Sequence, residues 1–159
     1  MLPTKLKLDV VTPEKRLVSE TVDEVVLPGR EGYLGVLPGH APLLTSLTIG
    51  RVQYRMGTDV RYLALAWGFA EVLPEKVTIL ADIAERSEEI DIERAREKKA
   101  EIERRMKEGG EDFDFAKAQA ALEKALVRIE IAEVYTRHAP GGPERRVSRG
   151  QVPKTDLTS

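Results

Sequence analysis

The spacing of the apolar residues changes once along the chain, near residue 86, and no other feature constrains the fold as strongly. Before that point apolar residues recur at every second position, as in Leu6, Leu8 and Val10, which is the spacing of a strand with one buried face. Beyond it the spacing becomes helical. These two halves predict a two-part α+β chain in which the strands come first.

Turn residues divide the first half into short strands. The alternating run at residues 51–56 is followed by a turn at residues 57–59, which predicts a hairpin, and Pro74-Glu75 predicts a second turn. Prolines fall between the runs, as ladder pairing requires. We therefore predict an antiparallel β-sandwich, or flattened barrel, over residues 1–86. Its later strands are expected at residues 51–56, 60–66, 68–73 and 76–81.

Two helices are predicted in the second half, at residues 91–107 and about 114–137, with Gly109-Gly110 ending the first. Together they form an antiparallel helical hairpin within residues 87–138. Its alanine-rich contact is small, so the hairpin is expected to be marginally held and able to move. The expected apolar stripes are Ile92, Ala95, Ile102 and Met106 in the first helix and Phe115, Ala118, Leu122, Ala125, Ile129 and Ala132 in the second.

Composition narrows the classes of function. The formal net charge of −2 argues against a nucleic-acid partner, and the absence of cysteine excludes disulfides and thiolate sites. The longest apolar run, residues 62–70, is too short to span a membrane, and the amino terminus does not have the pattern of a signal peptide, so we expect a soluble chain. Residues 139–159 show no periodicity and are predicted to be a disordered tail.

No catalytic constellation is visible in the sequence, so the chain is not expected to be an enzyme by itself. The two histidines, His40 and His138, lie far apart in the chain, which disfavours a metal site, and no phosphate-binding glycine loop occurs. His40 lies between prolines, where we expect it to hydrogen-bond neighbouring backbone. The stiffness of this segment suits a preformed contact surface.

The stretch IDIERA, residues 90–95, has two interpretations. If Asp91 caps the first helix, Arg94 occupies the third helical position, where the helix dipole disfavours a cation. In the first interpretation Glu88 and Glu89 offset this charge and the stretch is only a helix start. In the second, the guanidinium and the free amides of the first turn form an anion pocket. Physical reasoning on these residues alone leaves both open.

Two cations of the second helix present a similar choice. Lys124 and Arg128 lie one helical turn apart among alanines and leucines. Such a pair is usually part of a solvated helix face. Without an acidic residue between them, the two head groups are also able to form a joint anion site, although Glu123 and Glu130 lie close enough in sequence to neutralise them.

Four stretches carry a family resemblance: EGYLGVLPGHAPLLTSLTIG, ALAWGFAEVLPEKVTILAD, IDIERA and DFAKAQAALEKALVRIEIAE. In this order and spacing, between about residues 6 and 137, they closely resemble the epsilon subunit of the bacterial F-type rotary ATP synthase. The fold of that family, a β-sandwich followed by a helical hairpin, agrees with the change in apolar spacing.

The resemblance implies a non-catalytic central-stalk, or rotor, subunit of a proton-translocating complex that makes ATP from ADP and phosphate. Its sandwich would bind the gamma subunit and rest on the ring of c subunits, at the cytoplasmic face of the bacterial membrane and peripheral to it. No cofactor is implied as required. By match to the family motif, the segment from Glu31 to His40 would be a contact loop for the c-ring or gamma. The residues assigned to this loop are Glu31, Tyr33, Pro38 and His40.

The hairpin of such a subunit is regulatory. Folded down, it would lie against the sandwich; extended, it would enter the catalytic head of alpha and beta subunits and block ATP hydrolysis. Arg104, Arg105 and Arg128 are the candidates to meet acidic segments of beta, a role in which charge matching steers and orients.

The resemblance also implies a regulatory ATP that stabilises the folded-down hairpin. Asp91 would meet the adenine or ribose edge and Arg94 a phosphate. Lys124 stands where strong binders have an arginine, and Glu101 where an arginine is expected, so weak binding is predicted. The residues at the nucleotide-binding positions are Ile90, Asp91, Arg94, Ala95, Lys124 and Arg128. The alternative function is a free-standing ATP-binding sensor.

Overall fold

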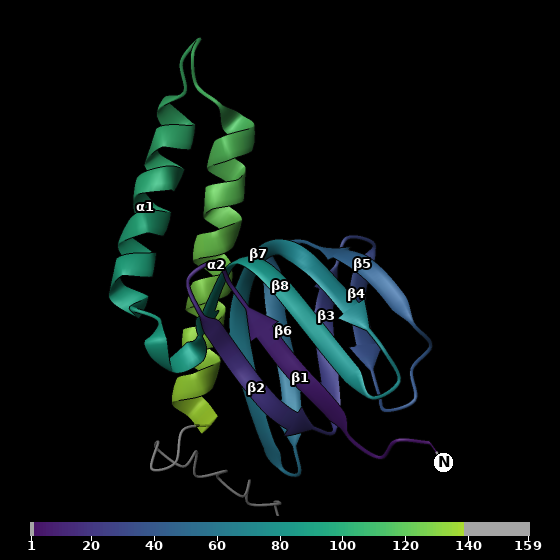
Figure 1. Cartoon of the computed structure of the whole chain (residues 1–159). Coiled ribbons are helices and arrows are strands. Elements are labelled where there is room, and N and C mark those ends of the chain that lie inside the picture. Colours follow the sequence, from purple (N-terminus) through teal and green to yellow (C-terminus); the bar gives the residue numbers. More distant parts are fainter. Residues whose placement is uncertain (1, 139–159) are drawn as a thin grey trace, which may run out of the picture.

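The computed structural model describes residues 2–138, which form a β-sandwich with a helical hairpin packed against its side (Figure 1). The predicted sandwich and hairpin are confirmed. The strands are β1 Leu6–Val11, β2 Arg16–Val22, β3 Glu24–Gly29, β4 Gly32–Val36, β5 Leu43–Leu47, β6 Gly50–Met56, β7 Asp59–Val72 and β8 Lys76–Arg86. A short 3₁₀ turn, η1 Ser87–Glu89, leads to helices α1 Ile92–Glu108 and α2 Phe115–His138. The predicted tail, residues 139–159, lies outside the described residues.

The eight strands form one continuous hydrogen-bonded network that wraps around a single core. The order is β2-β1-β8-β7-β5-β3-β4, and β6 closes part of the network by pairing with both β3 and β7. The alternation in β1 has the predicted effect, because Leu6, Leu8 and Val10 are fully buried. One pair is parallel, β1 with β8, which the all-antiparallel expectation did not include. The two strands are far apart in the chain, so no tight hairpin fixes their direction.

Strand β7 differs from the prediction because residues 60–66 and 68–73 do not form two separate strands. The strand runs unbroken and bends at Trp67 and Gly68, whose φ angles are 59° and 148°. Before the bend β7 pairs with β6, and after it with β5. The bend also shifts the alternation of inward-facing residues by one position. Leu63 and Leu65 belong to the core before the bend, and Ala70 and Val72 belong to it after the bend. This change of phase in the alternation is what resembled a break between strands.

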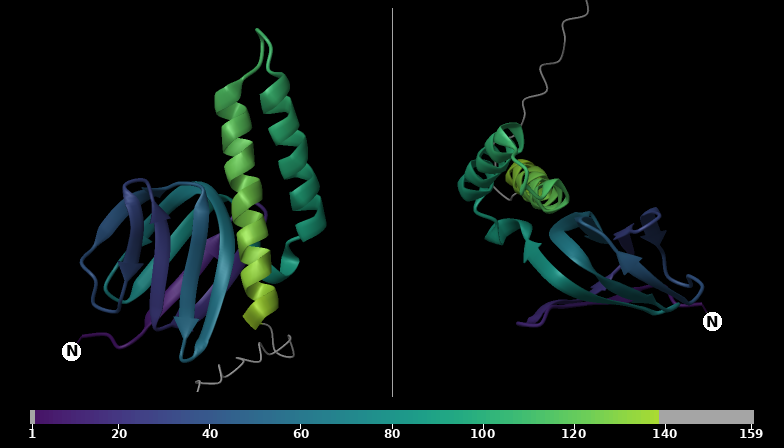
Figure 2. Two further views of the ribbon diagram at one scale, coloured as in Figure 1. Left: turned by 180° about the vertical axis from the view of Figure 1, so that it is seen from behind. Right: turned by 90° about the horizontal axis from the view of Figure 1, so that it is seen from above.

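The hairpin places α2 between α1 and the sandwich (Figures 1 and 2). Gly109 ends α1, as predicted, and its N–H donates to the Arg105 carbonyl at 3.0 Å. The predicted stripe of α2 is wrong in part, since Phe115 is exposed and the unpredicted Ile131 is fully buried. A helix covered on two sides buries a wider arc than the single stripe of a two-helix contact. None of the helices in the described part is long and apolar enough to cross a membrane.

The bend in β7 generates a stability prediction. A Cβ at Gly68 would collide with the Leu80 carbonyl oxygen and lie 2.9 Å from the Ala81 Cα, on a backbone with positive φ. We expect Gly68→Ala to lower the free energy of unfolding by more than about 2 kcal/mol in urea titrations. Gly35→Ala is the matched control, because its Cβ would meet no atom within 4 Å, and should cost less than about 0.5 kcal/mol. Equal effects of the two changes would contradict this account of the bend.

Candidate functional site

A polar cleft lies where α1 begins, between the hairpin and the end of β8. It encloses about 750 Å³. Five acidic and three basic side chains line it, so its formal charge is −2. The lining residues are Glu85, Glu89, Asp91, Arg94, Glu97, Lys98, Glu101 and Arg128. The cleft brings together Asp91, Arg94 and Arg128, which sequence analysis had placed in one nucleotide site.

The start of α1 confirms the predicted cap. The Asp91 carboxylate accepts a hydrogen bond from the Arg94 N–H at 3.1 Å, which satisfies one of the free amides of the first turn. Arg94 is exposed, and its guanidinium forms no ion pair within 4 Å among residues 2–138. Glu89, one of the two acids expected to offset it, pairs instead with Lys15 at 3.6 Å. The Arg94 side chain is therefore available to an anion.

The other two residues of the motif do not face the cleft. Ala95 is fully buried. Ile90 is half-buried and links η1 to α1, with its N–H donating to the Ser87 carbonyl at 3.3 Å. Neither residue lines the polar cleft.

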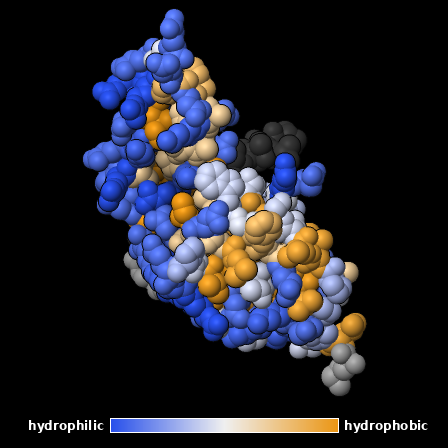
Figure 3. All heavy atoms as spheres, turned by 45° about the horizontal axis from the view of Figure 1, so that its top comes forward, coloured by the Kyte–Doolittle hydropathy of each residue, from blue (hydrophilic) through white to orange (hydrophobic). Residues whose placement is uncertain are grey.

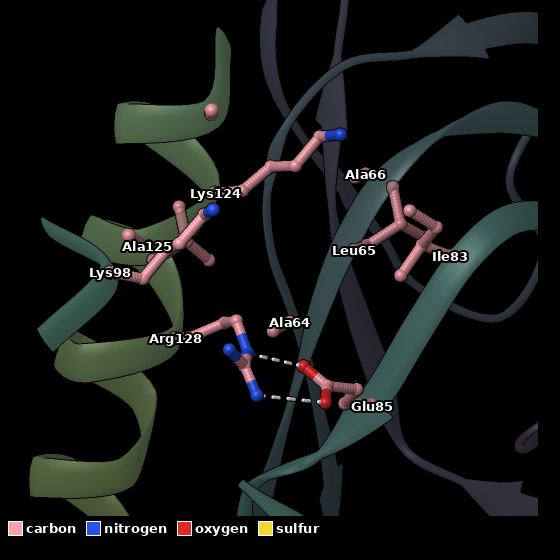
Figure 4. A pocket seen from close by; sticks show the side chains of 11 residues that line it. Ala64, Leu65, Ala66, Ile83, Glu85, Lys98, Lys124, Ala125 and Arg128 are labelled. Atoms are coloured by element: carbon pink, nitrogen blue, oxygen red, sulfur yellow. Dashed lines mark hydrogen bonds and ion pairs between the residues drawn. The ribbon is translucent and has the colours of Figure 1, made fainter. Parts of the chain in front are cut away.

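Arg128 is held by Glu85 in a two-pronged ion pair (Figure 4). Its Nε donates to one carboxylate oxygen at 2.7 Å and its terminal nitrogen to the other at 3.2 Å. About a quarter of the Arg128 side chain and a third of the Glu85 side chain are exposed, so water screens the pair only in part. The pair ties α2 to β8.

Lys124 turns away from Arg128 and contacts a different residue. Its Nζ lies 4.3 Å from the centre of the Trp67 ring, a cation–π contact that links α2 to the bend of β7. Figure 4 shows the two head groups directed to different parts of the sandwich. The joint anion site that the spacing of the two cations had suggested is not formed in this arrangement.

A third polar contact holds the exposed side of α2. The Arg51 guanidinium of β6 donates to the Glu130 carboxylate at 2.8 Å, and it lies 5.7 Å from the centre of the Tyr33 ring. Within the hairpin, Arg96 of α1 reaches Glu133 of α2 at 3.5 Å. The ion pairs of Arg51 and Arg128 and the Lys124–Trp67 contact thus attach the hairpin to the sandwich.

The segment predicted as a contact loop contains strand β4, so it is not one loop. Glu31 lies in the turn before β4, whereas Pro38 and His40 follow the strand at its other end. Tyr33 is exposed at the start of β4. The expectation for His40 is confirmed, because its Nδ1 hydrogen-bonds the neighbouring Ala41 carbonyl at 2.7 Å.

The remaining predicted residues lie on the solvent side of α1. Arg104 is exposed, and Arg105 is exposed and reaches the Glu101 carboxylate at 3.7 Å. Three residues that sequence analysis did not single out hold the hairpin: Glu85, Trp67 and Arg51. Nothing in their local sequence marks them, because their partners are 43 to 79 positions away in the chain. In the described part of the chain, no group of three or more acids and histidines is placed to hold a metal ion.

An exposed apolar patch lies on the outer face of the sandwich, beside the hairpin (Figure 3). We define it by Leu44, Phe69 and Leu80, which are 73%, 58% and 56% exposed. Phe69 and Leu80 are direct cross-strand partners on β7 and β8, and Leu44 lies on the neighbouring strand β5. Clustered exposed side chains of this size mark an interaction surface.

These features define a class: a two-part protein in which a β-sandwich with an exposed apolar patch carries a helical hairpin packed against its side. The family model of the ATP synthase delta/epsilon chain β-sandwich domain matches residues 5–87, and that of its long alpha-helix domain matches residues 88–133. The chain therefore belongs to the ATP synthase delta/epsilon chain family. It is a subunit of ATP synthase and not the catalytic one.

Similar proteins carry the epsilon name. The ATP synthase epsilon chain of Syntrophobacter fumaroxidans is 50% identical over 129 residues, which are 81% of this chain and 96% of that one. The epsilon chain of Koribacter versatilis is 54% identical over 104 residues, 65% of this chain and 73% of that one. A chain in the Euglena gracilis mitochondrial ATP synthase structure, which contains OSCP, F1 and c-ring, shares the fold with a TM-score of 0.70 at 24% identity, covering 84% of each chain.

The Arg128–Glu85 pair generates a prediction about attachment of the hairpin. We expect Glu85→Gln and Arg128→Gln each to speed hydrogen exchange of the α2 amides, because each change removes the charge that ties α2 to β8. A double-mutant cycle should give a coupling of about 0.5–1 kcal/mol. The control is the Glu101–Arg105 pair, which joins two residues of α1, so the corresponding Gln variants should leave α2 exchange unchanged. Zero coupling between residues 85 and 128 would show that the pair does not hold the hairpin.

Proposed function

We propose that the chain is a central-stalk rotor subunit of a proton-translocating ATP synthase and that its hairpin inhibits ATP hydrolysis. The observation that supports this most strongly is the difference between its two parts. The sandwich has a continuous strand network and one fully buried core, whereas α2 rests on it through small side chains and a few ion contacts. A rigid part suits transmission of rotation, and a weakly attached part suits a switch.

The sandwich would supply the contacts of the rotor. The apolar patch of Leu44, Phe69 and Leu80 fits a partner that buries apolar surface, and we assign it to the gamma subunit. The c-ring would be met by the turn at Glu31 or by the segment with Pro38 and His40. Since these lie at opposite ends of β4, one end would face the ring and the other would lie away from it. The subunit would be peripheral to the membrane, at its cytoplasmic face.

Binding of gamma tests the rotor proposal. We expect Phe69→Asp to weaken binding of the full chain to purified gamma subunit at least tenfold, because a carboxylate would be buried in the contact without a partner. Phe115→Asp is the matched control, since Phe115 is 53% exposed but begins α2, next to the turn that joins the two helices. Absence of binding between the wild-type chain and gamma would overturn the rotor proposal. If the chain binds ATP but does not bind gamma, the free-standing sensor would be favoured.

The hairpin would regulate by leaving the sandwich. Extension would break the Arg128–Glu85 and Arg51–Glu130 pairs and free Arg128 to act with Arg104 and Arg105 on acidic segments of beta. The Lys124–Trp67 contact would also be lost. Each of these contacts is worth on the order of 1 kcal/mol or less when exposed to water, so partner contacts of modest strength are able to shift the equilibrium.

A regulatory ATP would bind the packed hairpin at the polar cleft. The exposed Arg94 guanidinium, next to the first turn of α1, is the group best placed for a phosphate. The formal charge of −2 in the cleft opposes a triphosphate, and the carboxylate of Glu85 already neutralises Arg128. We therefore propose weak binding, which favours the packed state only by the difference in affinity between the two states.

Calorimetry on the full chain tests the nucleotide site. We expect a small saturable heat with ATP for the wild type, and none for Arg94→Ala at the same concentrations, because the phosphate contact is removed. Arg104→Ala is the control, since Arg104 is an exposed arginine of α1 that does not line the cleft. Equal heats for wild type and Arg94→Ala, or no heat in either, would leave residues 90–95 as a helix start only.

A further inference from the structure

A second cavity lies on the other side of Arg128, between α2 and strands β7 and β8, and it differs from the polar cleft in chemistry. It encloses about 360 Å³, near the lower end of the range for small-molecule sites. We call it the alanine cavity, because Ala64 and Ala66 of β7 and Ala121 and Ala125 of α2 line it. Figure 4 shows Ala125 on the helix side and Ala64 and Ala66 on the sheet side. Methyl groups on both sides are too short to fill the space between a helix and a sheet, so the space stays open.

The rest of the lining adds apolar walls and a cationic rim. Leu65, whose side chain belongs to the sandwich core, borders the cavity, and Ile83, which is 48% exposed, also lines it. Lys98, Lys124 and Arg128 supply three cations, against the single carboxylate of Glu85. Arg128 is engaged by that carboxylate, so the charge of the two lysines is not balanced within the cavity.

The two lysines are weakly engaged. Lys124 contacts the face of Trp67 and forms no ion pair within 4 Å in the described part of the chain. Lys98 reaches Glu101 at 3.8 Å, and its side chain is 56% exposed. An apolar space with two such ammonium groups at its edge matches a molecule with an apolar body and one anionic end.

We propose that the alanine cavity binds a free straight-chain alkyl carboxylate of medium length. The alkyl chain lies between Ala66 and Ala121. There it fills the space that the methyl groups leave open, which gives it dispersion contacts and removes its apolar surface from water. The carboxylate lies at the rim, between Lys98 and Lys124. A nucleotide does not fit this description, because the walls offer its sugar and base few hydrogen-bond partners.

Occupation of the cavity has a consequence for the switch. The ligand touches both α2 and the sheet, and extension of the hairpin would remove one wall of its site. It therefore binds the packed state in preference and shifts the equilibrium toward it. The alanine cavity shares Glu85, Lys98 and Arg128 with the polar cleft, but its other walls are apolar, so the argument for an alkyl ligand does not require ATP.

Trp67 makes the proposal measurable, because it is the single tryptophan of the chain and it contacts Lys124. The full chain is titrated with decanoate below its micelle concentration, with decanol as the neutral ligand and butyrate as the short one. We expect decanoate to change Trp67 fluorescence saturably and to raise the thermal midpoint. Butyrate should do neither at equal concentration, because it leaves the cavity unfilled.

Three variants separate the parts of the site. Lys124→Gln should weaken decanoate at least tenfold more than it weakens decanol, by thermal shift and calorimetry, because only the carboxylate loses a cation. Ala121→Leu fills the cavity and should abolish binding of both ligands. Lys117→Gln, a change at an exposed lysine of α2 outside the cavity, should match the wild type.

Two results would overturn the proposal. One is the absence of saturable decanoate binding to the wild type. The other is equal binding in wild type, Lys124→Gln and Ala121→Leu, which would mean non-specific association with the exposed apolar patch. If Ala121→Leu does not fold by circular dichroism, the charge variant Lys124→Gln and the decanoate–decanol comparison decide the matter.

Discussion

The contact between α2 and the outer face of β7 and β8 is the interaction on which the two-part structure depends. Alanines of α2 and β7 line the open alanine cavity and bury little surface, and the Arg128–Glu85 pair lies at its edge. The sandwich core does not include the hairpin, so loss of this contact would leave the core intact. The same contact borders the alanine cavity and, through Arg128, the polar cleft, and under the proposed function it would set how easily the hairpin leaves.

Arg128 lies where the polar cleft, the alanine cavity and the contact between α2 and β8 meet. Its side chain borders the polar cleft and the alanine cavity, and it pairs with Glu85 between them. The Glu85 carboxylate takes two of the five guanidinium N–H donors, so a phosphate or a partner carboxylate that binds Arg128 has to share the side chain with Glu85 or displace that carboxylate. Under the proposed function, nucleotide binding and hairpin extension would therefore compete for the Arg128 side chain. A small change in the free energy of either process would then shift the equilibrium of the hairpin.

The bend in β7 links the sandwich to the surfaces that surround it. At Trp67 and Gly68 the inward-facing positions change by one residue, which keeps apolar side chains in the core on both sides of the bend. The same change leaves Phe69 on the outer face next to Leu80. It also places the Trp67 ring beneath Lys124 of α2. Core packing, the apolar patch and the attachment of the hairpin thus share one backbone feature.

The sequence by itself determined the parts of this protein that depend on neighbours in the chain. Alternation gave strands with Leu6, Leu8 and Val10 inside, and the spacing after residue 86 gave two helices with Asp91 as a cap and Gly109 as an end. Tertiary structure alone decided the rest. It paired β1 with β8 in parallel, joined two expected strands into β7, covered α2 on two sides, and turned two neighbouring cations of α2 toward different partners. The physical reason is the range of the interactions, since periodicity and caps act over a few residues, whereas the contacts that hold the hairpin join residues 43 to 79 positions apart.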